Sequence, residues 1–178
     1  CIDMGSLDEV CAGFYAVFST KLWGHEVARC EEVLYRNNHH ARNRQDLANN
    51  DYALIKLDRT IHAKPLEINR EGFAPGDKVH PYVIDHISVF NSRIVKLNCT
   101  VSSESSNARD NVLENCPAIQ GNSGSSIFDT KGRVAGVLYA GEDTSVDETT
   151  PYETRIAAPT ISLGFSMDRI LEDLDAWL

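Results

Sequence analysis

The sequence lacks a long apolar run and lacks an excess of basic residues. No apolar stretch among its 178 residues approaches the roughly 18 residues that a membrane-spanning helix needs. The 17 lysines and arginines are outnumbered by 26 aspartates and glutamates, which gives a formal net charge of -9. Because nucleic acid and anionic membranes bind basic surfaces, we expect neither as a partner. The hydrophobic content of 42% is that of an ordinary globular protein with a core.

Helical periodicity is scarce, and it is convincing only from Met167 to Leu178, where apolar residues recur at i, i+3, i+4 and i+7. Most other apolar runs are short, β-branched or aromatic, and separated by glycine or proline. This rhythm predicts an antiparallel barrel or sandwich rather than βαβ units. The predicted strands cover residues 14–19, 28–35, 52–57, 78–84, 92–97, 126–128 and 133–139.

Metal-binding spacings are also missing. The six histidines lack the HExxH pattern of zinc proteases, and the acidic stretch 141–148 lacks the ligand spacing of an EF-hand loop. A solvated loop is the simpler interpretation of that stretch. We therefore expect no metal and no other cofactor.

Five cysteines, at positions 1, 11, 30, 99 and 116, are many for a cytosolic protein of this size. The pairs Cys11/Cys30 and Cys99/Cys116 each enclose a short, separate segment, which favours two local disulfides over five buried thiols. Cys1 is then left over. Disulfides indicate an oxidising compartment, so we expect a secreted or periplasmic protein.

The segment IQGNSGSSIFD, residues 119–129, concentrates turn residues directly before an apolar strand. It is either a hairpin turn or a turn that presents Ser123 for chemistry; Thr130-Lys-Gly132, a few residues later, predicts a hairpin by itself. A catalytic serine needs a base and donors for an oxyanion, and Gly121 tolerates the dihedral angles that would aim its N–H at the same space. The nucleophile elbow of α/β-hydrolases is excluded, because no histidine follows His86.

The remaining common order of a catalytic triad is His, Asp, Ser, and Asp51 is the best acid. It opens the run DYALIKLD, so its carboxylate lies at the start of a predicted buried strand, where it is well placed to orient an imidazole. The alternative is that Asp51 caps a turn.

The motifs DYALIKLD at Asp51 and GNSGS at Gly121, followed by GVLYAG ending at Gly141, resemble the trypsin-like serine peptidases of the chymotrypsin fold. The resemblance covers nearly the whole chain and implies an all-β protein with two antiparallel barrels and a C-terminal helix. As a single peptidase domain, it would comprise the remainder of the first barrel in residues 1–70, the second barrel in 71–165 and the helix in 166–178.

The same resemblance implies the roles of individual residues. Ser123 would be the nucleophile, Asp51 the acid, and the N–H groups of Gly121 and Ser123 the oxyanion hole. The backbone of Tyr139, Ala140 and Gly141 would pair with a polypeptide substrate as an added strand. Pro117 and Ala118 would line the specificity pocket, and because neither is a carboxylate, we expect an apolar or small substrate side chain rather than Arg or Lys.

The sequence departs from the family at the histidine and beside the serine. None of the six histidines follows an early strand in a Thr-Ala-Ala-His-Cys-like motif. We therefore expect the catalytic histidine immediately before Cys1 in the full protein, or on a separate N-terminal fragment. Asn122 stands where many members have an acid that pairs with a freshly cleaved N-terminus, so we expect no activation of that kind. A non-catalytic homologue that acts as a protein-binding module is the alternative function.

Overall fold

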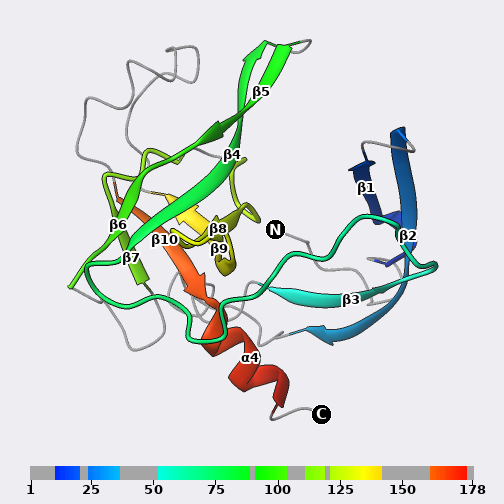
Figure 1. Ribbon diagram of the computed structural model, residues 1–178. Coiled ribbons are helices and arrows are strands. Elements are labelled where there is room, and N and C mark those ends of the chain that lie inside the picture. Colours follow the sequence, from blue (N-terminus) through cyan, green and yellow to red (C-terminus); the bar gives the residue numbers. More distant parts are fainter. Residues whose placement is uncertain are drawn as a thin grey trace, which may run out of the picture. The chain divides into compact units, whose positions relative to one another are not determined.

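A computed structural model describes residues 11–20, 24–36, 52–88, 91–103, 111–118, 121–141 and 161–175. The chain divides into two compact units, of which the first ends at Pro65 and the second begins at Leu66. Within the described residues, ten strands and the helix α4 (Met167–Asp175) give a predominantly β protein, as the sequence predicts (Figure 1).

The N-terminal unit contains a three-stranded antiparallel sheet in its described part. Its strands are β1 (Tyr15–Thr20), β2 (Gly24–Arg36) and β3 (Ala53–Leu57), in the order β1-β2-β3. The disulfide between Cys11 and Cys30 fastens the helical residues 11–13, which precede β1, to the middle of β2. Two barrels were expected; in this unit the described strands form an open sheet rather than a closed barrel.

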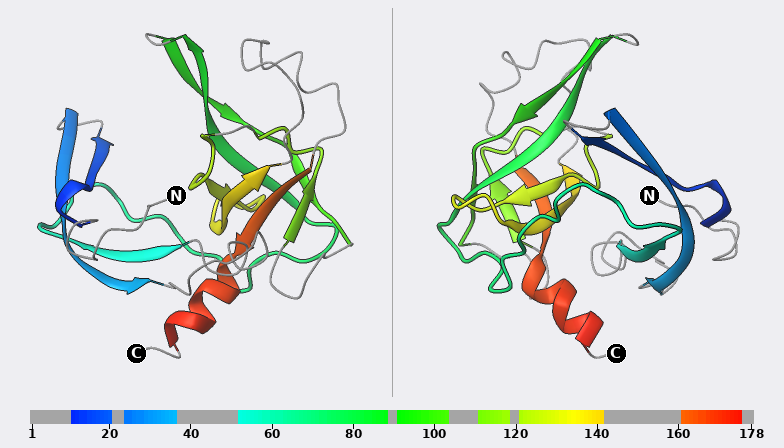
Figure 2. Two further views of the ribbon diagram at one scale, coloured as in Figure 1. Left: turned by 180° about the vertical axis from the view of Figure 1, so that it is seen from behind. Right: turned by 45° about the vertical axis from the view of Figure 1, so that its right-hand side comes forward.

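The second unit contains one closed six-stranded antiparallel barrel. Around the barrel the strands follow the order β4-β6-β7-β10-β9-β8, and β8 pairs again with β4. Figure 2 shows the strands of this unit in green, yellow and orange. A further strand, β5, extends β4 into a long hairpin (Figure 1). The bounds are β4 (Lys78–Ser88), β5 (Asn91–Lys96), β6 (Cys99–Val101), β7 (Asn111–Glu114), β8 (Ser126–Phe128), β9 (Val134–Gly141) and β10 (Ile161–Ser166).

The barrel is filled by aliphatic side chains and a disulfide. Leu113, Ile127 and Leu138 come from three different strands and are almost completely buried. Such close packing of apolar side chains is the main source of stability for a domain of this size. The core cluster consists of Phe73, Val79, Val83, Leu97, Cys99, Val101, Leu113, Cys116, Ala118, Ile127, Ala135 and Leu138.

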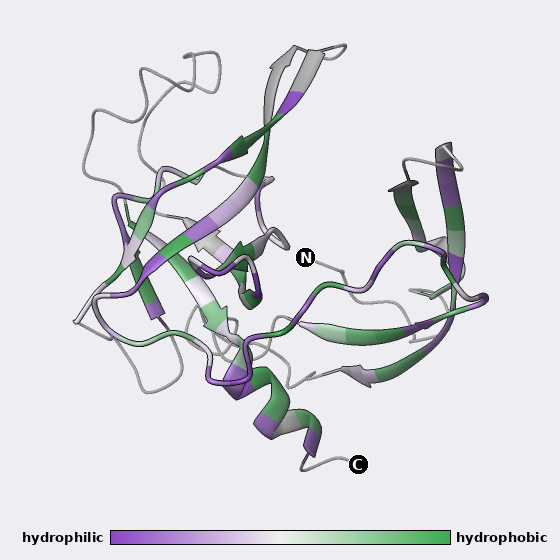
Figure 3. Ribbon diagram, in the orientation of Figure 1, coloured by the Kyte–Doolittle hydropathy of each residue, from purple (hydrophilic) through white to green (hydrophobic). Residues whose placement is uncertain are grey.

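The helix α4 begins at Met167, where the sequence analysis placed its start. Met167 and Ile170 are buried, whereas Arg169 and Glu172 are exposed and form an ion pair one turn apart. This division of hydrophobic and hydrophilic residues between the faces of the helix is seen in Figure 3. In the described part of the chain, no helix is long and apolar enough to cross a membrane.

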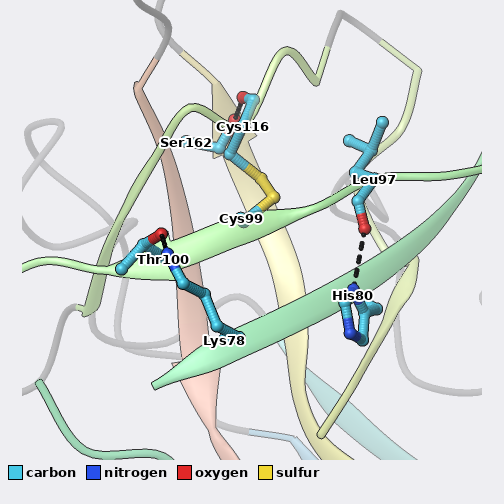
Figure 4. The surroundings of a disulfide bond; sticks show 7 residues. All are labelled: Lys78, His80, Leu97, Cys99, Thr100, Cys116 and Ser162. Carbon is cyan, nitrogen blue, oxygen red and sulfur yellow. Dashed lines mark hydrogen bonds between the residues drawn. A yellow bond between two sulfur atoms is a disulfide. The ribbon is translucent and has the colours of Figure 1, made fainter. Parts of the chain in front are cut away.

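Both expected disulfides form, and the second one lies inside the barrel. Cys99 in β6 and Cys116 after β7 are fully buried, and the Ser162 hydroxyl of β10 donates a hydrogen bond to the Cys116 carbonyl at 2.6 Å (Figure 4). The disulfide and this hydrogen bond together link three neighbouring parts of the barrel wall. Two disulfides fit an extracellular or periplasmic protein.

We expect the double substitution Cys99→Ala/Cys116→Ala to lower the free energy of unfolding by about 3 kcal/mol, the entropic effect of freeing a loop of this size. The sequence separation is 17 residues for this pair and 19 for Cys11/Cys30, so the loop term is nearly equal in the control Cys11→Ala/Cys30→Ala. The barrel variant also loses buried sulfur atoms, so it should be the less stable of the two in urea denaturation followed by circular dichroism. Equal midpoints for the barrel variant and the wild type would contradict this expectation.

Candidate active site

The turn that carries Ser123, residues 121–125, connects the buried segment after Cys116 to β8. Two of its residues, Gly121 and Gly124, have φ angles of +90° and +89°, a region that glycine adopts with little strain. The backbone of the turn is bonded to β9: the Gly124 N–H donates to the Leu138 carbonyl at 2.7 Å, and the Leu138 N–H donates to the Ser125 carbonyl at 2.9 Å. The turn is therefore held beside β9 by main-chain bonds on both sides of Gly124.

Ser123 is exposed at the tip of this turn. Its hydroxyl donates a hydrogen bond to the Tyr139 carbonyl of β9 at 2.9 Å. The side chain thus lies against the strand that the sequence analysis assigned to substrate binding. Among the described residues, the N–H groups of Gly121 and Ser123 have no main-chain acceptor.

The β9 segment opposite the turn is bordered by β10 on its other side. Ala140 pairs with Leu163, and Gly141 pairs with Ser162. The pairing of β8 with β9 extends only to Ser126 and Val137, so beyond Val137 the β9 edge faces the Ser123 turn instead of a strand.

Asn122, directly before Ser123, is only 3% exposed. Its side-chain amide nitrogen donates to the Ile84 carbonyl of β4 at 3.0 Å, and its own carbonyl accepts the Ser125 N–H at 3.1 Å. From the sequence, Asn122 is notable only because it replaces an acid. The neutral amide is a donor that reaches a neighbouring strand, and no pattern in the sequence indicates that partner.

The residues expected at the floor of a specificity pocket, Pro117 and Ala118, are both buried. Ala118 belongs to the core cluster, and its N–H donates to the Cys116 carbonyl at 2.8 Å. They follow the barrel disulfide directly, so the backbone that leads into the Ser123 turn is anchored. Their role in specificity stays a prediction.

The expected acid Asp51 and the expected histidine before Cys1 lie outside the described residues, so the assembly of the triad stays a prediction. Asp58, which follows β3 directly, is among the described residues. Hydrogen bonds from the Arg59 side chain, and next from the Arg29 backbone N–H, lower the pKa of Asp58 to about 2. These bonds give Asp58 a structural role at the end of β3.

Three histidines have described side chains. The Nδ1 atom of His80 in β4 lies 3.2 Å from the Leu97 carbonyl (Figure 4). In the N-terminal unit, the Glu26 carboxylate accepts the His62 backbone N–H at 3.0 Å and lies 3.3 Å from Nδ1 of its exposed ring. His25 pairs with Ser19 in the β1–β2 ladder. His39 and His40 lie outside the described residues.

A cavity of about 380 Å³ lies elsewhere on the barrel, where residues 69–79 meet the β8–β9 hairpin. Its walls include the buried ring of Phe73 and the charged side chains of Asp77, Lys78 and Arg133. No residue of the Ser123 turn lines it, and acidic and basic groups balance there. It is therefore separate from the candidate site, which rests on the geometry of the turn.

The second turn around β8 is the hairpin that the sequence analysis predicted at residues 130–132, and it is confirmed. Asp129 accepts hydrogen bonds from the N–H groups of Lys131 and Arg133, each at 2.9 Å, and its other oxygen pairs with the Arg133 guanidinium at 2.8 Å. Partial burial acts to raise the pKa of Asp129, but the hydrogen bonds from Arg133 and Lys131 outweigh it and lower that pKa below its ordinary value. The two turns thus differ. The Asp129 side chain closes the hairpin, whereas the Ser123 side chain is exposed and bonds to β9.

No protein-family model matches the sequence, and no curated protein matches it. The fold defines an antiparallel β-barrel protein with two disulfides. That architecture is compatible with a chymotrypsin-like fold, and the functional argument rests on the residues of the Ser123 turn.

We expect Asp129→Asn to lower the free energy of unfolding at pH 7 by about 1–2 kcal/mol, because it removes the charge from a partly buried ion pair and weakens its hydrogen bonds. The pKa of Asp129 is lower in the folded state, so its contribution is complete above the unfolded pKa, near 3.8, and is lost as the pH falls through the folded value. Urea denaturation at pH 7 and at about pH 3 should therefore show a smaller difference between variant and wild type at the acidic pH. Thr130→Ala, in the same hairpin, is the control; a difference that does not change with pH would refute the assignment.

Proposed function

We propose that the protein is a serine endopeptidase of the chymotrypsin-like fold, with Ser123 as its nucleophile. The observation that carries the proposal is the exposed Ser123 hydroxyl at 2.9 Å from the Tyr139 carbonyl, on a turn with two positive-φ glycines bonded to β9. The turn is bonded to β9 through its main chain and leaves the serine exposed, which is the arrangement that an attacking hydroxyl needs. The closed barrel around this turn and the two disulfides support the same proposal.

In the proposed reaction, a histidine removes the Ser123 proton, and Oγ forms a bond to the carbonyl carbon of the scissile peptide. The negative charge that develops on the carbonyl oxygen is stabilised by the N–H groups of Gly121 and Ser123. The C–N bond then breaks, and the leaving amine takes the proton from the histidine. Water, deprotonated by the same histidine, attacks the acyl-enzyme and releases the acid and Ser123.

The resting hydrogen bond of Ser123 sets a requirement for this step. Its proton points to the Tyr139 carbonyl, so the hydroxyl must rotate toward the base before it attacks. We propose that this base is a histidine oriented by Asp51. The N-terminal unit, with its disulfide-linked sheet, would contribute the remainder of the first barrel.

A polypeptide substrate would lie along β9 at residues 139–141, where β8 no longer pairs with it. Main-chain hydrogen bonds along an added strand give affinity without strict side-chain preference. Pro117 and Ala118 would favour an apolar or small substrate side chain next to the scissile bond. The protein would act in a secreted or periplasmic setting, consistent with its disulfides.

A fluorophosphonate probe, which forms a covalent bond with an activated serine, tests the proposal directly on the full-length protein. We expect labelling of the wild type, complete loss of labelling in Ser123→Ala, and retention of labelling in the control Ser125→Ala from the same turn. Circular dichroism melting checks that each variant is folded, because losing one exposed hydrogen bond costs at most about 1 kcal/mol. Absence of labelling in folded full-length wild type would contradict the peptidase and favour the non-catalytic binding module.

A pair of glycine substitutions separates the oxyanion role from ordinary backbone strain. Gly121 and Gly76 have nearly the same φ, +90° and +88°, and neither has an atom within 4 Å of an added Cβ. We expect Gly121→Ala and Gly76→Ala to lose similar stability, about 1–2 kcal/mol, because an L-residue is strained at this φ. Only Gly121→Ala should reduce the labelling rate, by about 100-fold if one oxyanion donor is displaced. Equal labelling rates of the two folded variants would argue against an oxyanion hole at Gly121.

A further inference from the structure

Asn122 links the turn that carries Ser123 to β4, the strand that pairs with β8 where the barrel closes. Its side chain is buried, and its amide nitrogen donates to the Ile84 carbonyl at 3.0 Å. The ladder between β4 and β8 has only two registered pairs, His80 with Phe128 and Pro81 with Ile127. Beyond them β8 gives way to the turn, so the Asn122 amide continues the contact with β4 where main-chain pairing has ended.

The turn is therefore held from two sides. On the β9 side, main-chain bonds join Gly124 and Ser125 to Leu138. On the β4 side, the contact to Ile84 comes from the Asn122 side chain, and the Asn122 carbonyl also accepts the Ser125 N–H inside the turn. A shift of Asn122 would thus move the residue next to Ser123 and loosen the turn from within.

We propose that Asn122 is a positioning residue whose amide, bonded to the Ile84 carbonyl of β4, holds Ser123 in its reactive orientation. The inference rests on the proposed peptidase function and deepens it, because it names the group that fixes the nucleophile. The contact joins an uncharged donor to an uncharged acceptor. This contact is therefore not an ion pair, and we expect salt to screen it little.

The substitution Asn122→Asp tests the donor with almost no change in shape. At neutral pH an aspartate at this place offers only acceptors, so two oxygens face each other where the bond to Ile84 was. At acidic pH the carboxyl becomes protonated, and its O–H can donate to Ile84 again. A loss that is reversed by acid distinguishes the missing donor from a general loss of packing.

Asn69 supplies a matched control in the same unit. It is also buried, at 6% exposure, and its side-chain nitrogen donates to the Gly72 carbonyl at 2.7 Å. It lies outside the Ser123 turn, in the segment before β4. Asn69→Asp therefore removes the same kind of bond and lowers stability in the same way without touching the nucleophile.

We expect the fluorophosphonate labelling rate of folded Asn122→Asp at pH 7.5 to be about tenfold below that of the wild type, the effect of one lost hydrogen bond. The ratio of the two labelling rates, variant to wild type, should rise toward one at about pH 5, because the new carboxyl is then protonated. Taking the ratio cancels the titration of the catalytic base, which both proteins share. Folded Asn69→Asp should label within about twofold of the wild type at both pH values. Equal rates for Asn122→Asp and wild type at pH 7.5, or an equal loss in both variants, would overturn the inference.

Hydrogen exchange provides a second measurement that does not require catalysis. In Asn122→Asp at pH 7.5, the amides of Gly124 and Ser125 should exchange about tenfold faster than in Asn69→Asp, because the turn is no longer held to β4. If the wild type fails to label, the peptidase proposal fails, and this exchange comparison alone decides whether Asn122 positions the turn. Identical exchange in the two variants would show that it does not.

Discussion

The fold of the second unit depends on the seam between β4 and β8, where the six-stranded sheet closes on itself. Only two residue pairs form the seam, so its strength comes from what lies on either side of it. At one end Asp129 closes the β8–β9 hairpin through charge-assisted bonds to Arg133. At the other end the Asn122 amide reaches Ile84. Side-chain hydrogen bonds thus lie at both ends of β8, in addition to its ladder with β9 and the burial of Ile127.

Much of this fold follows from sequence patterns, and the parts that do not have physical reasons. The long strands, the hairpin after Asp129, both disulfides and the start of α4 were predicted correctly. Three strands, β6, β7 and β10, were missed. In β10 the buried positions include Ser162 and Ser166, whose hydroxyls bond to the Cys116 carbonyl and the Phe73 N–H. A serine satisfied by the backbone of another segment gives no apolar alternation, so only the tertiary structure identifies it as a core position.

The candidate site likewise has residues that the sequence predicts and contacts that it does not. Local turn chemistry predicted Gly121 and Ser123, because a positive-φ glycine close to an exposed serine is a property of adjacent residues. The contact of Asn122 with Ile84 joins residues 38 positions apart, and nothing near either residue indicates it. The expected acid Asp51 is likewise a distant partner, so its role stays a prediction. Sequence reasoning finds groups that act through their own backbone and misses those that act through a remote one.

These observations bear on how a serine hydroxyl can be held in a reactive position in the turn before a strand as short as β8. A turn with two glycines is easily deformed, because glycine has the widest choice of backbone conformations. Bonds to β9 alone would leave the turn free to swing about that strand. The second attachment, to Ile84 of β4, restricts that freedom, and it lies where β4 has left its ladder with β8 and pairs with β5. The position of Ser123 is then set by the closure of the barrel itself, so the element that stabilises the fold is also the one that orients the proposed nucleophile.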